Sequence, residues 1–167
     1  MKQVYFVRHA KSSWADPFLS DEERPLNARG KRDAPFMASM MVLKEKTPDL
    51  IISSTAVRAR RTAGYFRKAF GLKKNQLIKD HRLYLASPQV MIDTIRELPD
   101  QYESVYIFGH NPGMTDIANF FANDYVENVP TCGIFKVTCE VDAWYEINKY
   151  NSKLTVFYFP KQFNLDS

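Results

Sequence analysis

The chain has 167 residues, of which 45% are hydrophobic and 25% charged, a composition typical of one globular domain over residues 1–167 and too apolar for a disordered chain. No stretch approaches the roughly 18 apolar residues of a membrane span, and Arg8 interrupts the first apolar run early, so we expect a cytoplasmic protein without a signal peptide. Residues 1–83 carry 18 Lys and Arg against 8 Asp and Glu, whereas residues 84–167 carry 5 against 11. This asymmetry indicates either a solvated basic face or an anion site.

The first half of the chain predicts two buried strands, each followed by a helix. Short β-branched and aromatic runs mark strands at residues 3–7 and 49–53. Apolar side chains at helical spacing then predict helices at residues 27–46 and up to residue 70.

Residues at the helix ends refine these boundaries. Pro35 moves the expected start of the first helix toward residue 32, because proline disfavours a helix interior. Ser54 and Thr55 are the N-cap candidates of the second helix, and Gly71 is its expected end.

The second half continues this alternation after an irregular stretch with a short strand near Leu77. It predicts in turn a helix, a strand, a helix and two strands: residues 88–98, 104–108, 112–122, 134–141 and 154–159. Helices that alternate with short, wholly apolar strands indicate an α/β fold. We therefore expect a three-layer α/β/α sandwich with a mostly parallel central sheet.

The two cysteines, Cys132 and Cys139, match neither a disulfide nor a metal site. On one continuous strand they would lie about 23 Å apart and on opposite faces, whereas a disulfide needs Cα atoms within about 7 Å. No C-x-x-C spacing occurs. We expect two buried thiols.

Basic residues and histidines follow the buried strands where ligands bind open α/β sheets, beyond the carboxyl ends of the strands. Arg8 and His9 follow the first strand, Arg58 comes shortly after the second, and His110 follows the third. Two of the three histidines of the chain therefore lie at strand ends, whereas His81 lies in a polar loop and is expected to be exposed. This grouping favours an active site.

Two helix starts fit a bound anion. Arg58, Arg60 and Arg61 fall in the first turns of a helix, where the macrodipole favours anions over cations. We expect Arg58 to face a ligand and the other two to face solvent. Asn111 as N-cap and Pro112 as first helical residue would leave backbone N–H groups free to bind an anion.

Three motifs, in this order and spacing, resemble those of the histidine phosphatase superfamily, which is also called phosphoglycerate mutase-like. They are Arg8-His9-Ala10 for Arg-His-Gly, residues 54–62 for S-x-x-x-R-A-x-[QE]-T, and Gly109-His110 for Gly-His. Within this superfamily, the chain looks most like the branch of small SixA-like phosphohistidine phosphatases. This resemblance rests on its short length, on residues 8–14, and on Arg24-Pro25-Leu26-Asn27 followed by Gly30. Ala10 replaces a glycine, which a negative φ permits, and Arg61 replaces the usual Gln.

The resemblance, which extends to about residue 140, implies a phosphoglycerate mutase-like fold and a phosphatase that needs no metal or other cofactor. His9 would attack as the nucleophile and form a phosphohistidine intermediate that water hydrolyses. Arg8, Arg58 and His110 would hold the phosphoryl oxygens, since phosphoryl transfer depends on positioning and charge stabilisation. The second ring nitrogen of His9 should donate to a backbone carbonyl.

The candidates for further substrate contact surround this nucleophile: Arg24, Asn111 and Lys11. Arg24 can equally anchor its loop through a salt bridge with Asp21 or Glu23. Trp14 can line the entrance or act as a hydrophobic plug that ties down the loop.

The general acid of many relatives, a Glu, has no counterpart here, because Tyr84 stands near its expected position. An alkoxide leaving group needs a proton in the transition state, whereas a protonated phosphoramidate of imidazole needs less help. The absence of this Glu therefore favours a phosphohistidine substrate, although Asp16, Asp21 or Glu22 could still supply an acid.

Three functions compete. The preferred partner is a phosphorylated protein that carries phosphohistidine, reached through a shallow site, because no long insertion could form a lid. The alternative is a small phosphorylated metabolite, hydrolysed by a phosphomonoesterase with the same residues; a mutase would need a deeper pocket for two phosphates. A non-enzymatic polyanion-binding module is less favoured, and we expect neither a nucleic-acid nor a membrane partner.

Overall fold

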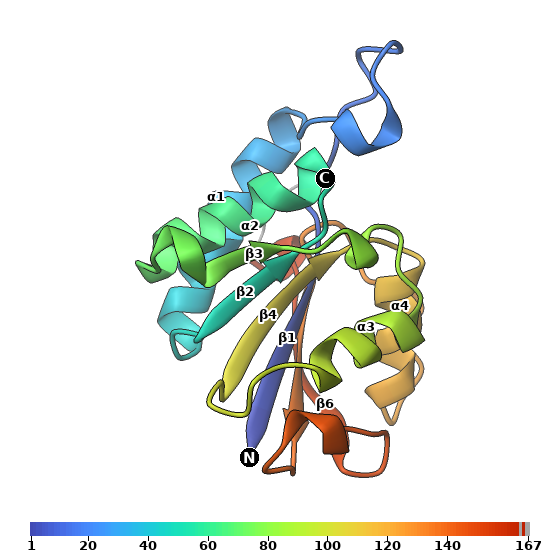
Figure 1. Ribbon diagram of the computed structural model, residues 1–167. Helices are drawn as coiled ribbons and strands as arrows, with labels where there is room; N and C mark the ends of the chain where they lie inside the picture. The colour runs from blue at the N-terminus through green and yellow to red at the C-terminus, as the bar shows by residue number, and fades with distance from the viewer. Residues whose placement is uncertain (164, 166–167) are drawn as a thin grey trace.

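The computed structural model describes residues 1–163 and 165, and a six-stranded sheet forms its middle layer (Figure 1). The strands are β1 Lys2–Arg8, β2 Leu50–Ser53, β3 Leu77–Lys79, β4 Ser104–Gly109, β5 Ile134–Cys139 and β6 Ser152–Tyr158. Their order across the sheet is β3-β2-β4-β1-β5-β6. Neighbouring strands pair in parallel except β5, which is antiparallel to both β1 and β6. The predicted mostly parallel sheet is confirmed.

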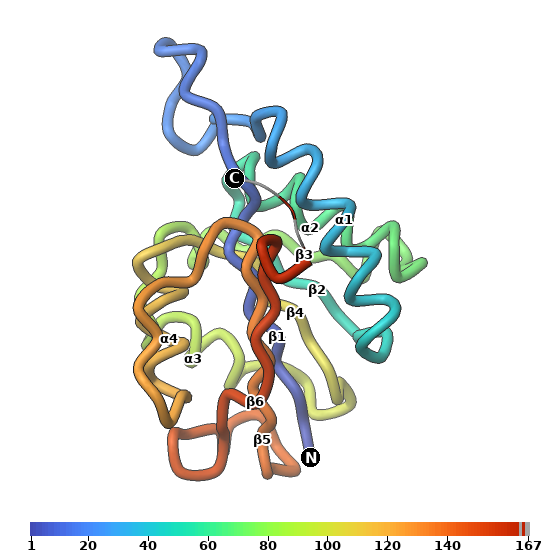
Figure 2. Tube along the Cα trace, turned by 180° about the vertical axis from the view of Figure 1, so that it is seen from behind, coloured from blue at the N-terminus to red at the C-terminus, as the bar shows by residue number. Residues whose placement is uncertain are grey.

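Helices cover both faces of this sheet (Figures 1 and 2). Helices α1 (Ala28–Lys44) and α2 (Val57–Phe70) lie on one face, and α3 (Pro88–Arg96) and α4 (Gly113–Phe121) on the other. Side chains of β1 alternate between the two cores, since Tyr5 packs with the α1/α2 layer and Phe6 with the α3/α4 layer. The α/β/α sandwich is thus as predicted.

Over residues 1–163 and 165, no helix combines the length and apolar character that crossing a membrane would require. Cys132 and Cys139 are free and buried, as expected from their spacing.

Helix α1 begins earlier than the sequence predicts. The Asn27 side chain accepts a hydrogen bond from the Gly30 backbone N–H (2.9 Å), which caps the helix four residues before the expected start near residue 32. Gly30 also lies against the carbonyl oxygen of Lys11, where a Cβ atom would come within 2.2 Å. These two contacts fix the start of α1, and Pro35 is accommodated inside the helix.

The predicted N-caps of α2 are also wrong. The N-cap is Ala56, and its backbone N–H donates to the Ser54 hydroxyl (3.2 Å). Ser54 belongs instead to the strand end, and Thr55 uses its hydroxyl to bind Glu22. The predicted stop is right, since Gly71 adopts a left-handed φ of 70°.

The strand register brings the predicted functional segments to one edge of the sheet. Strand β4 lies between β1 and β2, with Gly109 opposite Arg8 and Phe108 opposite Ser53. The ladder continues past the strand ends, because the His9 N–H donates to the Gly109 carbonyl (3.1 Å). The residues that follow β1, β2 and β4 therefore converge.

Candidate active site

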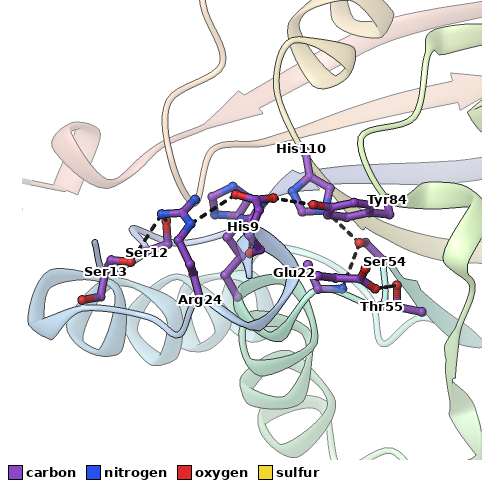
Figure 3. A network of polar contacts seen from close by, with 12 residues as sticks. His9, Ser12, Ser13, Glu22, Arg24, Ser54, Thr55, Tyr84 and His110 are labelled. Carbon is purple, nitrogen blue, oxygen red and sulfur yellow. Dashed lines mark hydrogen bonds and ion pairs between the residues drawn. The ribbon is translucent and has the colours of Figure 1, made fainter. Parts of the chain in front are cut away.

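A small cavity of about 210 Å³ lies where these strand ends converge. Every residue expected at the site lines it: Arg8, His9, Lys11, Arg24, Arg58, His110 and Asn111. The rest of the wall comes from Ser12, Trp14, Leu85 and Thr131. Segments far apart in the sequence thus build one pocket around two histidines, as Figure 3 shows for His9 and His110.

His9 has the geometry of a nitrogen nucleophile. Its Nδ1 lies 2.7 Å from the carbonyl oxygen of Ala10, and a carbonyl only accepts, so Nδ1 carries the proton and Nε2 the lone pair. Burial lowers the pKa of His9 to about 3, and the charges of Arg58 and Arg8 act in the same direction. The imidazole is therefore neutral at physiological pH. The predicted hydrogen bond to a backbone carbonyl is present, and Ala10 has no positive φ.

Two arginines, the half-buried Arg8 and the buried Arg58, place positive charge in the wall of the cavity. Arg8 donates from Nη1 to the Val129 carbonyl (3.0 Å), and burial lowers its pKa. Arg58 donates from Nη1 to the backbone carbonyl of Asp21 (2.6 Å). The Nε atoms of both guanidinium groups are buried and have no protein partner among the described residues. An oxyanion in the cavity would supply the missing acceptors.

His110 is held as a second neutral imidazole beside His9. Its Nε2 lies 2.8 Å from the Ser54 hydroxyl, which also accepts from the backbone N–H of Ala56. Its Nδ1 is buried and has no partner in the part of the chain that the structure describes. Burial, followed by the charge of Arg58, lowers the pKa of His110 to about 4. The two imidazole centroids are 5.2 Å apart.

Asp21 connects the loop between β1 and α1 to the cavity. Its carboxylate pairs with Nη2 of Arg58 (2.9 Å) and Nε of Arg24 (3.2 Å), and it accepts a hydrogen bond from the Tyr84 hydroxyl. The Tyr84 bond and the Arg58 charge hold the pKa of Asp21 well below its usual range. The carboxylate is ionised at physiological pH, so it orients cations rather than supplying a proton.

The other two acidic candidates lie elsewhere. Glu22 accepts a hydrogen bond from the Thr55 hydroxyl (2.6 Å), at the side of the site shown in Figure 3. Asp16 is exposed and accepts from the backbone of Phe18. Tyr84 packs edge-on against His110, with centroids 5.4 Å apart.

Both readings of Arg24 describe part of its environment. It lines the cavity and also pairs with Asp21, and its Nη1 donates to the Ser12 hydroxyl (3.0 Å). The Trp14 ring stacks on its guanidinium at 3.5 Å. Because Trp14 is 74% exposed, it forms part of the entrance and is not a buried plug.

Asn111 lines the cavity and caps the first turn of α4, although it lies one residue before the N-cap, the position that the sequence predicts for it. The N-cap is Pro112, and the Asn111 side chain accepts from the Thr115 N–H (3.1 Å) while donating to the Val129 carbonyl (3.1 Å). The helix start therefore offers no row of free N–H groups, and the predicted anion site there is wrong. Lys11 is half-buried in the same wall.

The sequence did not reveal which loop side chains orient the reactive groups. The sequence predicts Ser54 as an N-cap, whereas this residue directly follows β2 and its hydroxyl is 2.8 Å from His110 Nε2. The contacts of Asp21 span 37 residues to Arg58 and 63 to Tyr84. Its spacing of three residues from Arg24 was the one local signal.

The arrangement offers a neutral nucleophile among fixed positive charges. No group of three His, Cys, Asp or Glu side chains in the described chain is placed to hold a metal ion. The guanidinium groups of Arg8 and Arg58 supply positive charge that would stabilise a phosphoryl group.

Comparisons with known proteins agree with this geometry. The family model described as histidine phosphatase superfamily (branch 1) matches residues 4–84. The SixA protein of Agrobacterium tumefaciens has 28% sequence identity and a TM-score of 0.78, over 95% of this chain and 99% of that one. The structure of the protein histidine phosphatase SixA complexed with tungstate has 18% identity and a TM-score of 0.81, over 96% and 99%. The uncharacterized protein Rv1276c of Mycobacterium tuberculosis is 28% identical over 165 residues, covering 93% of this chain and 100% of that protein. The family match and the likeness to the A. tumefaciens protein together support the histidine phosphatase superfamily, in its SixA-like branch, as the family of this chain, and phosphatase activity of that type.

Proposed function

We propose that this phosphatase hydrolyses phosphohistidine on a protein, with His9 as the nucleophile. The observation that carries the proposal is the state of His9: its Nδ1–H is bound to the Ala10 carbonyl, and burial keeps the ring neutral. A lone pair on Nε2 is thereby held beside Arg8 and Arg58, the cations that would stabilise a phosphoryl group.

The proposed reaction has two steps at one nitrogen. The lone pair of His9 Nε2 attacks phosphorus, and the bond from phosphorus to the substrate imidazole breaks, with its electron pair leaving on that imidazole. Water then attacks the phosphorylated His9 and restores the neutral ring, and its protons end on the departing phosphate. Arg8, Arg58 and His110 would contact the phosphoryl oxygens in both steps.

Two features support a protein phosphohistidine over a small phosphoester. The Asp21 carboxylate is ionised and paired with Arg58 and Arg24 of the cavity wall, so a leaving group that needs little protonation fits best. The cavity, at about 210 Å³, is also smaller than the roughly 300–1,000 Å³ typical of small-molecule sites. It admits the phosphorylated end of a side chain while the rest of the substrate stays outside. The SixA protein of A. tumefaciens is named as a candidate phosphohistidine phosphatase.

Trapping of the intermediate tests the nucleophile. Wild-type protein mixed with a ³²P-labelled phosphohistidine peptide and quenched within milliseconds should carry a base-stable, acid-labile label. His9→Ala should carry none, whereas His81→Ala should label normally, because His81 is an exposed histidine outside the cavity. Label that persists in His9→Ala would disprove the mechanism.

A panel of substrates tests the substrate class. We expect kcat/KM for a phosphohistidine protein to exceed that for sugar and nucleotide phosphates, and we expect activity to persist in EDTA. A strong preference for one small phosphoester would identify a small-molecule phosphomonoesterase instead.

A further inference from the structure

A second concave surface lies outside the catalytic cavity, between α2 and the edge strand β3. It has a volume of about 440 Å³ and is lined by Arg60, Arg61, Gly64, Tyr65, Lys68, Leu77 and Lys79. We call these residues the α2–β3 groove. Arg61, Gly64, Tyr65 and Lys68 follow the spacing of one helix face, and β3 lies beside α2 at the end of the sheet (Figure 1).

The charges of this groove are positive and unneutralised. Arg61, Lys68 and Lys79 are exposed, and within the described residues no carboxylate forms an ion pair with them. Helix α2 contains no acidic residue. Arg60 is half-buried and donates from Nε to a backbone carbonyl, that of Thr55 (2.9 Å). Four neighbouring cations without a counter-charge form a surface that attracts anionic segments.

Gly64 keeps the groove open although the fold does not need a glycine there. A Cβ atom at Gly64 would meet nothing within 4 Å, and its φ is not positive. Glycine inside a helix costs about 1 kcal/mol relative to alanine. The helix thus accepts a destabilising residue at the one groove position where any side chain would project into the open space.

The groove and the catalytic cavity share no lining residue, but both take side chains from the first turns of α2. Arg58 points into the cavity from the first turn of α2, and Arg60 follows two residues later. The carbonyl that binds Arg60 belongs to Thr55, whose hydroxyl contacts Glu22 in the loop above the site. Lys68 lies ten residues beyond Arg58, or about 15 Å along the helix axis. An extended chain covers this distance in about five residues.

We propose that the α2–β3 groove binds an acidic segment of the protein whose phosphohistidine enters the catalytic cavity; this rests on the proposed function. The ligand is a polypeptide segment with Asp or Glu about three to six residues from the phosphohistidine. A single-stranded nucleic acid would need exposed aromatic rings for stacking. The one aromatic residue of the groove, Tyr65, is instead packed against the hydrophobic core.

Binding of an unphosphorylated peptide tests the groove independently of catalysis. Two fluorescein-labelled peptides are compared, identical except for Glu or Gln at positions three to six from a central His. We expect wild-type protein to bind the Glu peptide about tenfold more tightly at low salt, and 0.5 M NaCl to abolish most of this preference. Equal binding of the two peptides would overturn the proposal.

Substitutions at Gly64 place one charge in the groove without removing any contact. Gly64→Glu should raise the Kd of the Glu peptide at least about fivefold relative to Gly64→Gln, whereas Gly64→Lys should lower it. The matched control is Lys153→Gln, which lowers the net charge by one unit, as Gly64→Glu does, but on β6, at the opposite edge of the sheet. If Lys153→Gln weakens binding as much as Gly64→Glu, long-range charge and not the groove is responsible.

Turnover then separates the two proposals. On phosphorylated versions of the peptides, Gly64→Glu should raise KM for the Glu peptide and leave hydrolysis of a small phosphoramidate unchanged. If the Glu peptide binds but wild-type protein hydrolyses no phosphohistidine, the proposed function fails while the groove remains an acidic-peptide site. If a single-stranded RNA 12-mer binds more tightly than the Glu peptide and Gly64→Glu abolishes this, the groove is a nucleic-acid site and the proposal is wrong.

Discussion

The catalytic cavity and the α2–β3 groove are both basic, but they hold their charges in different ways. In the cavity, Arg58 is buried and Arg8 half-buried, and Asp21 pairs with Arg58. In the groove, Arg61 and Lys68 are exposed and have no carboxylate partner in the described chain. Both regions belong to the basic first half of the sequence.

The comparison shows that burial decides what a cluster of cations can do. Burial lowers the pKa of His9, and the charges of Arg58 and Arg8 act in the same direction at short range, where low dielectric leaves them little affected by salt. Exposed charges act at longer range and are screened by salt. We therefore assign the chemistry to the cavity and partner recognition to the groove.

The sharpest test compares two arginines three residues apart on α2. Arg58→Ala should lower kcat for a small phosphoramidate about 100- to 1,000-fold, the usual cost of losing one donor that stabilises transition-state charge. Arg61→Ala should leave the same kcat within about twofold, because its side chain lies in the groove. Equal losses in the two variants would break the distinction between the regions, with urea unfolding as the check that both remain folded.

Acid should destabilise the protein through the buried histidines of the cavity. His9 and His110 have folded pKa values of about 3 and about 4, whereas the unfolded value is about 6.5. Between these values the unfolded chain binds more protons, so stability is lost as the pH falls below about 6.5. From pH 7 to pH 5 the free energy of unfolding should drop by about 4 kcal/mol.

Urea titrations at the two pH values measure this drop. His9→Gln should remove about half of it, and His81→Gln, which changes an exposed histidine, should remove none. A drop that is unchanged in His9→Gln would show that His9 is not buried in its neutral form.

The substitution Asp21→Asn makes the cavity resemble the groove, because Arg58 and Arg24 then lack a carboxylate partner. We expect kcat to fall about tenfold, since Arg58 and Arg24 lose the ion pairs that orient them. As a positioning residue, Asp21 should affect a phosphohistidine peptide, p-nitrophenyl phosphate and an alkyl phosphate by the same factor. A loss confined to the alkyl phosphate, whose leaving group needs a proton, would instead identify Asp21 as a general acid.

Much of the fold and the centre of the site follow from local sequence patterns. Apolar runs locate the strands, and the carboxyl ends of parallel strands meet at one edge, which places His9 and His110 together before any contact is known. Motif spacing adds Arg8 and Arg58. Each of these predictions depends on residues close in sequence or on a general property of parallel sheets.

The supporting contacts could not be predicted, because they join segments far apart in sequence. The hydroxyl of Ser54 has two uses, as a cap or as a partner of His110, and only the register of β2 and β4 decides between them. Asn111 has the residue type of an N-cap, and its side chain does accept from the Thr115 N–H in the first turn of α4 while also donating to the Val129 carbonyl. Local propensity predicts the first of these contacts but not the second, which joins distant segments.

The smallest expected effect concerns the glycine of the groove. Gly64→Ala should raise the free energy of unfolding by about 0.5–1 kcal/mol, because alanine loses less conformational entropy in a helix and its Cβ has open space. Gly30→Ala is the opposite case in α1, since its Cβ would come within 2.2 Å of the Lys11 carbonyl oxygen, and it should destabilise the fold. Thermal unfolding of both variants measures the difference. Destabilisation by Gly64→Ala would mean that the space beside α2 is filled in the folded protein, and the groove could not then admit a peptide.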